Sequence, residues 1–269
     1  MLQSAPPPGR RTVLAVAAAM LAGILLGPSA IAATEPPIAA AADLNAALPE
    51  VAALFQKATG ETVKLTFGSS GNFAQQIQNG APFEVFLSAD EGYVRTLAAA
   101  GKTDGEGTLY AIGRIGVFQP KGSAIRADGQ LKDLGAAVRD GRLQKFAIAN
   151  PEHAPYGRAA QEALTHAGLW SAIQPKLVLG ENVAQATQFA TSGSAQGGII
   201  PLSLALTPQV AAAGSFALIP ADWYKPLRQR AVLIKGAGET ARAFYAFLQT
   251  PPARAVFKRY GFVASRETP

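Results

Sequence analysis

The stretch Val63–Gly80, VKLTFGSSGNFAQQIQNG, decides the class of fold of this chain. Its first five residues alternate between apolar and polar, as in a half-buried strand, and Phe73 and Ile77 then share one face of a helix. Between them, Gly68-Ser69-Ser70-Gly71 is a flexible junction whose serine hydroxyls can donate hydrogen bonds. Gly80 fits the left-handed residue that ends many helices. The stretch therefore predicts a strand, a small polar junction and a helix, which is the repeating unit of an α/β domain.

The rest of the chain repeats this unit, with short β-type runs followed by amphipathic helical runs. The expected strands are 38–41, 63–67, 83–87, 109–118, 145–149, 176–179, 198–200, 216–219 and 229–234. The expected helices are 45–59, 73–79, 91–100, 131–140, 157–167, 183–192, 239–249 and 252–260. This alternation predicts an α/β fold with a largely parallel sheet.

The N-terminal segment has the pattern of an export signal. Arg10 and Arg11 give it a positive start, residues 13–26 are apolar, and Ala30-Ile31-Ala32 fits a cleavage site made of small residues. Fourteen apolar residues fall short of the roughly 20 that a membrane-spanning helix needs. We therefore expect a cleaved signal peptide over 1–32 and a mature protein in the periplasm. The arginine pair leaves the Sec and the twin-arginine routes both open.

Composition limits the classes of function. Removing residues 1–32 leaves 237 of the 269 residues, enough for two small domains or one large one. The chain has no cysteine, which excludes disulfides, a thiol nucleophile and a thiolate metal site. The formal charge falls from +6 to +4 without the two signal arginines, and the remaining basic residues are scattered. We therefore expect no nucleic-acid binding, and at most a weak attraction for anions.

Four junctions that precede expected helices are rich in small residues and in helix-capping residues. They are 41–45 (AADLN), 67–71 (FGSSG), 149–157 (ANPEHAPYG) and 180–183 (GENV). A helix N-terminus presents unpaired N–H groups and about half a positive charge, so it attracts anions. In an open α/β sheet such junctions lie at the carboxyl ends of the strands, where ligands bind. Together they predict an anion pocket without lysine or arginine, although ordinary capping explains any one junction alone.

We do not expect an enzyme, because the residue groupings that catalysis needs are missing. The two histidines, His153 and His166, belong to no triad and to no metal-binding spacing such as H-E-x-x-H. The junction 67–71 lacks the lysine of a nucleotide-binding P-loop. We expect no cofactor and no directly coordinated metal ion.

Three motifs carry a resemblance to a known family. They are NGAPFEVFLSAD at 79–90, ANP at 149–151 together with APYG at 154–157, and FKRYGF at 257–262. Through them the chain resembles the periplasmic molybdate-binding proteins of ABC importers (ModA-like, type II periplasmic binding proteins) over essentially the whole mature length. The first and last motifs are long and are rarely matched by chance.

The resemblance implies a fold of two lobes, each a mixed, mostly parallel sheet flanked by helices, with the ligand in the cleft between them. The chain would cross the hinge twice. After the signal peptide, the first lobe would consist of residues 33–114 and 229–269, and the second lobe of residues 115–228.

The resemblance also implies a ligand and its contacts. Carried over position by position, Ser70 would bind an oxyanion through its hydroxyl and its amide, and Tyr156 and Val183 through their backbone amides. The ligands from the first junction would be Ala42 and Asp43. The implied cargo is molybdate, and we expect tungstate to bind as well because it is nearly isosteric. The implied partners are a membrane permease and its separate ATPase, and we expect a monomer.

Asp43 departs from the family, which places a serine or an asparagine at this position. A carboxylate cannot donate a hydrogen bond, and its repulsion of an anion at about 4 Å is on the order of 4 kcal/mol per unit charge at an effective dielectric near 20. Three interpretations are open: Asp43 caps a helix and turns only its N–H to the ligand, it is protonated, or the ligand differs. We favour the helix-cap interpretation, because aspartate suits an N-cap.

A second departure is Pro201, where one branch of the family has a tyrosine that touches the ligand. The pocket would then resemble the other branch, which uses Tyr156. Another oxyanion such as sulfate, or a different small solute, is the alternative ligand within the same fold. The ligand-sensing domain of a regulator shares this fold, but the export signal and the absence of a helix-turn-helix argue against that function.

Overall fold

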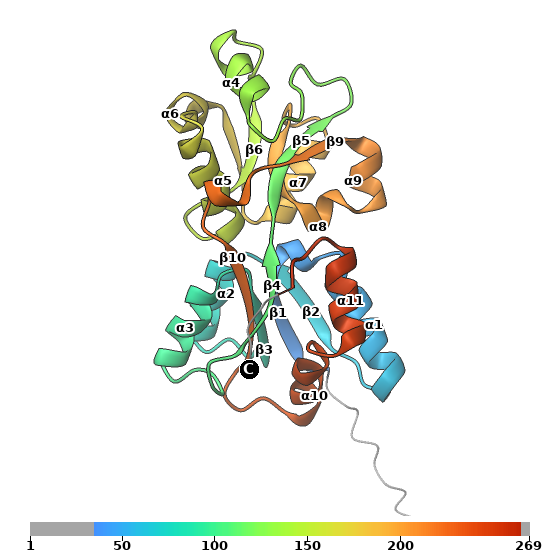
Figure 1. The fold of residues 1–269 in the computed structure, drawn as a ribbon. Coiled ribbons are helices and arrows are strands. Elements are labelled where there is room, and N and C mark those ends of the chain that lie inside the picture. Colours follow the sequence, from blue (N-terminus) through green and yellow to red (C-terminus); the bar gives the residue numbers. More distant parts are fainter. Residues whose placement is uncertain (1–34, 265–269) are drawn as a thin grey trace, which may run out of the picture. The chain divides into compact units, whose positions relative to one another are not determined.

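The computed structural model describes residues 35–264 (Figure 1). The signal peptide predicted over 1–32 lies outside these described residues. Within them, no helix is both long enough and apolar enough to cross a membrane. The described elements include two five-stranded sheets, each flanked by helices.

The first sheet has the strand order β2-β1-β3-β10-β4. β1 is parallel to β2 and β3, whereas β10 comes from near the end of the chain and is antiparallel to β3 and β4. The strands are β1 (Pro37–Ala41), β2 (Lys64–Gly68), β3 (Val85–Ser88), β4 (Thr108–Gly113) and β10 (Leu227–Leu233). The central strands are buried on both faces, which explains why β1 and β3 are apolar throughout or nearly so.

Two separate cores lie on the faces of the first sheet. Ile38 of β1 packs in the cluster that includes Phe55 of α1, whereas its neighbour Ala39 packs in the cluster that includes Phe73 of α2. Figure 1 accordingly shows α2 and α3 on one side of the sheet and α1 and α11 on the other. The helices are η1 (Ala42–Leu44, a 3-10 helix), α1 (Ala47–Thr59), α2 (Ser70–Gln78), α3 (Glu91–Ala99), α10 (Glu239–Phe247) and α11 (Pro251–Arg259).

The second sheet has the strand order β7-β6-β8-β5-β9. β6 is parallel to β7 and β8, and β5 is antiparallel to β8 and β9. The strands are β5 (Ile115–Pro120), β6 (Phe146–Ala149), β7 (Leu177–Gly180), β8 (Gly198–Pro201) and β9 (Gly214–Leu218). The helices are α4 (Lys132–Arg139), α5 (Pro155–His166), α6 (Trp170–Ile173), η2 (Gln174–Lys176), α7 (Val183–Thr191), α8 (Leu202–Ala205), α9 (Pro208–Ala213) and η3 (Ala221–Trp223).

The chain passes between the two sheets twice. β4 ends at Gly113 in the first sheet and β5 begins at Ile115 in the second, so the single strand expected over 109–118 is two strands. The return leads into β10, which begins at Leu227 in the first sheet. Two mixed sheets flanked by helices confirm the expected two-lobe α/β class. The lobe boundaries at 114/115 and 228/229 stay a prediction.

Most expected elements are present with shifted ends. The helix expected from Phe73 begins at Ser70, and the helix expected from Gly157 begins at Pro155, because the junction residues themselves form the first helical turn. The sequence did not reveal α6, α8 and α9, which at four to six residues are too short to show a helical period. Gly80 has a φ of 89°, which confirms it as a left-handed helix end.

The substitution Phe55→Ala tests whether the last part of the chain completes the first lobe. Phe55 is fully buried, and its ring lies 5.3 Å from that of Phe244 and 5.6 Å from that of Phe247, both in α10. We expect a loss of about 3–5 kcal/mol in the free energy of unfolding, measured by urea denaturation. Leu218→Ala is the control, since Leu218 is exposed and should change stability by less than about 0.5 kcal/mol. Equal effects of the two substitutions would contradict this packing.

Candidate functional site

Residues from all four polar junctions line one small cavity. Its walls come from the starts of η1, α2, α5 and α7, with one further residue after β3. The lining residues are Ala41, Ala42, Asp43, Gly68, Ser69, Ser70, Ala89, Ala154, Pro155, Tyr156, Asn182 and Val183. The cavity volume is about 10 Å³, far below the roughly 300–1,000 Å³ of sites for drug-sized ligands. The structure thus brings together all five predicted ligand positions, and their role as ligands stays a prediction.

The helix starts at this cavity keep backbone N–H groups available. In α7 the side chain of Asn182 accepts from the N–H groups of Ala184 and Gln185, so it leaves the N–H of Val183 uncapped. In α5 the N-cap residue Ala154 has no side-chain acceptor, and Pro155 has no N–H at all. The N–H of Tyr156 is therefore the first donor of α5. Groups in the first turn of a helix have no acceptor within the helix, so these N–H groups can serve a ligand.

Ser70 is the first residue of α2 and is 1% exposed. Its Oγ accepts a hydrogen bond of 2.9 Å from the N–H of Ala89, which follows β3. Because the oxygen already accepts, the hydroxyl proton is the group that it can still offer. The neighbouring Ser69 is the N-cap of α2, and its Oγ lies 3.0 Å from Nδ1 of His153. Ser70 therefore has its hydroxyl oriented by the protein in the way that a donor to an anion requires.

Asp43 lies in the same cavity wall and is completely buried. Its Oδ2 accepts from the Tyr156 hydroxyl at 2.9 Å and from Nε2 of Gln229 at 2.5 Å. Its Oδ1 has no hydrogen-bond partner among the described residues. Burial raises the pKa of this carboxyl from 3.8 to about 7, although the hydrogen bonds from Gln229 and Tyr156 act to lower it. Asp43 is therefore the one carboxylic acid among the described residues that line the cavity, and its charge depends on pH near neutrality.

The helix-cap interpretation of Asp43 is wrong. The N-cap of η1 is Ala41 and that of α1 is Ala46, and neither helix has a side-chain cap. The carboxylate instead accepts hydrogen bonds from Tyr156 and Gln229. These bonds are stronger than a bond at an exposed cap position, because all three groups are buried together. The Tyr156 hydroxyl, whose role the sequence left open, is likewise bound to Asp43.

A wider buried network holds Asp43 in place. The Tyr110 hydroxyl donates to Oε1 of Gln229 at 2.6 Å, which orients the amide so that Nε2 faces Asp43. The register between β10 and β4 shifts between Gln229 and Arg230, opposite Tyr110, and such a bulge re-aims the side chains beside it. The hydroxyl of Ser203, in α8, donates to the backbone oxygen of Asp43 at 2.8 Å. The pKa values of Tyr110 and Tyr156 are raised by burial, so both remain hydrogen-bond donors.

Sequence reasoning missed Tyr110, Ser203 and Gln229 as residues that support the site. The one available signal was Gln229, a neutral polar residue inside the expected strand 229–234. Pro201, the second departure from the family, ends β8 and is not part of the cavity wall. Ser203, two residues further on, supplies a hydroxyl from this part of the chain instead.

Contacts between the two lobes close one side of the cavity. The N–H of Gly71 in α2 donates to the backbone oxygen of His153 at 2.9 Å. A side chain at position 71 would place its Cβ 2.5 Å from that oxygen, so this approach requires glycine. Nearby, Arg158 of α5 donates to Asp90 at 2.6 Å and to the hydroxyl of Tyr93 at 2.8 Å. Residues of both lobes therefore contact one another beside the cavity.

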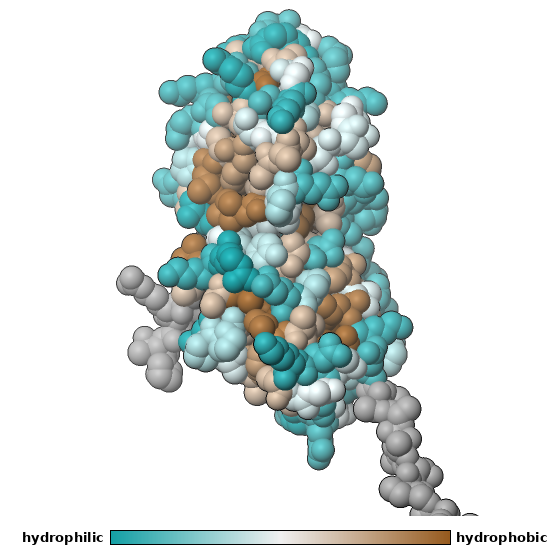
Figure 2. Space-filling model, turned by 90° about the vertical axis from the view of Figure 1, so that its right-hand side faces the viewer, coloured by the Kyte–Doolittle hydropathy of each residue, from teal (hydrophilic) through white to brown (hydrophobic). Residues whose placement is uncertain are grey.

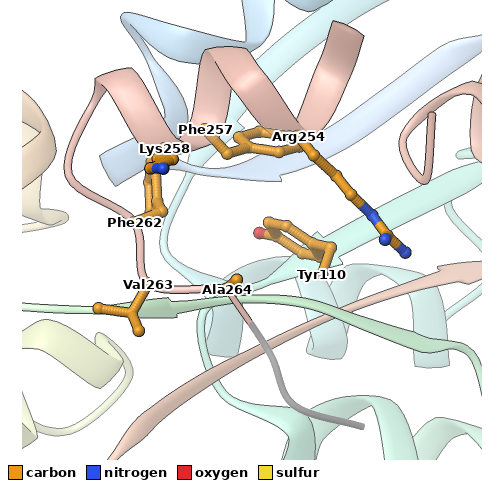
Figure 3. A pocket seen from close by; sticks show the side chains of 7 residues that line it. All are labelled: Tyr110, Arg254, Phe257, Lys258, Phe262, Val263 and Ala264. Atoms are coloured by element: carbon orange, nitrogen blue, oxygen red, sulfur yellow. The ribbon is translucent and has the colours of Figure 1, made fainter. Parts of the chain in front are cut away.

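A second cavity, of about 60 Å³, lies beneath α11 (Figure 3). Figure 3 shows the rings of Tyr110 and Phe257 beside each other, and their centroids are 5.3 Å apart. The charged ends of Arg254 and Lys258 lie at opposite ends of the cavity in this view, so they do not converge on one anion. None of the four junctions lines this cavity. We therefore place the candidate site at the junctions and not under α11.

The two histidines show no catalytic arrangement. The ring of His166 stacks on Trp223 with centroids 4.5 Å apart, and His153 contacts Ser69 and Glu181 at the edge of the cavity. No group of three or more metal-ligating side chains occurs within residues 35–264. Apart from the Asp43 carboxyl, the side chains and first-turn N–H groups described above offer hydrogen-bond donors to the cavity.

Comparison with known proteins agrees with this geometry. The family model of the bacterial extracellular solute-binding proteins matches residues 37–263. The molybdate-binding protein ModA of Azotobacter vinelandii is 38% identical, with 94% of this chain and 96% of the relative covered. The protein of the same name from Rhodobacter capsulatus is also 38% identical, with 93% and 95% covered. A relative from Bacillus subtilis, named a putative ABC transporter substrate-binding lipoprotein, is 28% identical, with 84% and 85% covered.

Solved structures are similar in the same way. The periplasmic molybdate-binding protein of Azotobacter vinelandii has a TM-score of 0.77 and 32% identity, and 86% of this chain and 100% of that chain are covered. The sulfate-binding protein SubI of Mycobacterium tuberculosis has a TM-score of 0.69 at 16% identity, with 87% and 88% covered. The similarity to the sulfate-binding protein SubI concerns the fold alone.

The substitution Asp43→Asn should stabilise the protein more at pH 8 than at pH 4. The pKa of Asp43 is about 7 in the folded protein against 3.8 as its ordinary value, so between these values the folded state holds a proton that the unfolded state lacks. The stability from this proton is complete below about pH 4 and is lost as the pH rises through about 7, a change of about 4 kcal/mol. Asparagine does not titrate, so the free energy of unfolding of the variant, relative to the wild type, should rise by up to that amount between pH 4 and pH 8. Urea denaturation across this pH range measures it.

Asp128→Asn is the control with the opposite sign. Partial burial acts to raise the pKa of Asp128, but hydrogen bonds from the N–H groups of Gln130, Lys132 and Asp133 outweigh it and lower the pKa. Its contribution to stability is therefore present at neutral pH and lost on acidification, so this variant should lose more stability at high pH than at low pH. A stability difference between the Asp43→Asn variant and the wild type that stays constant with pH would contradict a raised pKa for Asp43.

Proposed function

This chain belongs to the family of bacterial extracellular solute-binding proteins, and from that premise we propose that it captures molybdate and delivers it to an ABC importer. The observation that carries the proposal is the convergence of four helix N-termini on one small cavity. None of the described residues that line this cavity is a lysine or an arginine. Such a site would hold an oxyanion by hydrogen bonds from neutral donors, helped by the partial positive charge of the helix ends.

Each predicted ligand position has a role in this proposal. The Ser70 hydroxyl, already oriented by Ala89, would donate to one ligand oxygen. The N–H groups of Ser70, Tyr156 and Val183 would donate from the first turns of three helices. Ala42 and Asp43 would contribute N–H groups from η1. Small residues around these positions let the ligand approach the backbone closely, as backbone recognition requires.

The identity of the oxyanion follows from the relatives and from the cavity size. The relatives named as molybdate-binding proteins support molybdate, and we propose that tungstate binds as well. The small volume argues against a large organic solute. Sulfate is the second candidate, since Asp43 replaces a serine or an asparagine at this position and changes what the cavity wall offers to the ligand.

We also propose where the protein acts and with what. The names of the relatives, periplasmic in one case and an ABC transporter lipoprotein in another, support a site of action outside the cytoplasm. A cleavable signal, a membrane permease, a separate ATPase and a monomeric state belong to the proposal. The large exposed hydrophobic side chains among the described residues, Leu179, Leu206, Leu218 and Val263, come from different parts of the chain. Figure 2 shows that on one face the hydrophobic residues gather towards the middle of the molecule, with hydrophilic residues around them.

Calorimetric titration of the mature protein tests the assignment. We expect heat of binding with molybdate and with tungstate, and weaker or no binding with sulfate and phosphate. Binding of sulfate alone would select the second candidate. Absence of heat with molybdate and tungstate would overturn the proposed cargo, provided that a thermal shift assay at high ligand concentration also shows no stabilisation.

The substitution Ser70→Ala should weaken molybdate binding by about 1 to 3 kcal/mol, or roughly 5- to 150-fold in Kd, because a donor to a buried charge is lost. Ser88→Ala is the matched control. Ser88 is also a fully buried serine next to the end of β3, but its hydroxyl donates to the backbone oxygen of Asp90 and it does not line the cavity. Both variants should lose some stability, and only Ser70→Ala should lose affinity. Equal affinities of the two variants would exclude Ser70 as a ligand.

A further inference from the structure

The two oxygens of the Asp43 carboxyl have unequal surroundings. Oδ2 accepts one hydrogen bond from Tyr156 of α5 and one from Gln229 of β10. Oδ1 is buried and has no partner among the described residues. Asp43 is also part of the cavity wall, which otherwise offers donors. An unpaired buried oxygen is unusual in a folded protein and calls for a group that is absent from the protein itself.

Among residues 35–264, no basic group acts on the pKa of Asp43 to balance a negative charge. The titratable groups that face it are the hydroxyls of Tyr156 from α5 and Tyr110 from β4, with Tyr224 behind Tyr156. β10 presents the neutral Gln229 to it, and α8 presents Ser203. The segments of β2 and α7 at the cavity present Gly68 and Val183. An ionised Asp43 would therefore be a buried charge facing neutral donors alone, namely Gln229, Tyr156 and its own backbone N–H, and this favours the neutral acid.

We propose that Asp43 determines specificity in the proposed site by carrying a proton on Oδ1 and donating it as a hydrogen bond to the bound oxyanion. This inference rests on the proposed function. A fully deprotonated tetrahedral dianion would enter together with one proton whenever the free protein has Asp43 ionised. The carboxylic acid keeps Oδ2 as the acceptor for Tyr156 and Gln229, so the rest of the network is unchanged. The proton converts the one repulsive group of the cavity into a donor.

The raised pKa of Asp43, about 7, agrees with this arrangement, since little free energy is needed to protonate the group at neutral pH. A bound dianion favours the neutral acid further, so the ligand and the proton bind cooperatively. The ligand class follows from the same chemistry. An oxyanion with all its oxygens deprotonated accepts from Oδ1–H, whereas a ligand that carries its own proton can use an ionised Asp43 as the acceptor and needs no proton uptake.

The dependence of Kd on pH tests the proposal. For the wild type with tungstate or molybdate, Kd should rise about tenfold for each pH unit above about pH 7 and level off below it. Titrations in buffers with different heats of protonation should show uptake of close to one proton per ligand at the high-pH end. Sulfate, if it binds, should follow the same pattern because it too is a dianion.

Two variants at the network make the test specific to Asp43. In Asp43→Asn the amide oxygen can replace Oδ2 and the NH₂ group can donate in place of Oδ1–H, so binding should persist with no change in Kd across the range. In Tyr156→Phe the backbone N–H is kept but one hydrogen bond to Oδ2 is lost. That bond lowers the pKa of Asp43, so its loss should move the start of the rise in Kd to higher pH. A merely structural role of Asp43 predicts neither result.

Two control variants test whether another hydrogen-bond donor or another titrating group causes the pH dependence of Kd. Ser70→Ala should raise Kd at every pH and keep the wild-type slope. His153→Gln should also keep the slope, and this tests the contribution of His153, which contacts Ser69 at the edge of the cavity. A wild-type Kd that does not change with pH, or an Asp43→Asn variant with the wild-type slope, overturns the inference alone. Absence of molybdate and tungstate binding at every pH overturns the proposed function and the inference with it.

Discussion

The backbone N–H groups in the first turn of a helix have no acceptor within the helix, and four such turns meet at one cavity in this protein. The parallel strands are what bring them together. β1 and β2 point the same way in the first sheet, as do β6 and β7 in the second, so the helix that follows each strand begins at the same edge of its sheet. The other features of the site serve this arrangement. Pro155 and Ala154 leave α5 without a cap, and Asn182 caps α7 without covering its first N–H.

The Asp43 network links this cavity to the places where the chain crosses between lobes. Gln229 belongs to β10, just after the second crossing, and Gly113 ends β4 at the first. A side chain on Gly113 would place its Cβ 2.2 Å from the Tyr156 hydroxyl and 3.0 Å from Nε2 of Gln229, so the network needs glycine there. Tyr156 and Ser203 reach Asp43 from the second lobe. The hydrogen bond from Tyr156 to Asp43 therefore crosses between the lobes, whereas the one from Gln229 lies within the first lobe.

Local sequence patterns predicted those parts of the structure that local forces determine. The alternation of strands and helices and the glycine at the end of α2 depend on neighbours within a few residues. The role of Asp43 does not depend on such near neighbours, because its partners Tyr156 and Gln229 lie 113 and 186 residues away in the sequence. An aspartate before a helix has a strong preference for capping, and only tertiary packing could override it. The sequence also did not predict that 109–118 forms two strands. An apolar segment can pass from one sheet to another without a change in its sequence pattern.

The cavity also differs from most anion sites in where the cations of the protein lie. Arg158 pairs with Asp90, and Arg228 and Arg230 pair with Glu91, so these three basic side chains are engaged with acids outside the cavity wall. A cation in the wall would attract any anion, because Coulomb attraction depends on charge and distance and hardly on shape. Neutral donors act only at hydrogen-bond distance and in the right direction, so they select by geometry. The selectivity for one oxyanion then depends on the rigidity of the helix starts, and the carboxyl of Asp43 is compatible with that selection only in its neutral form.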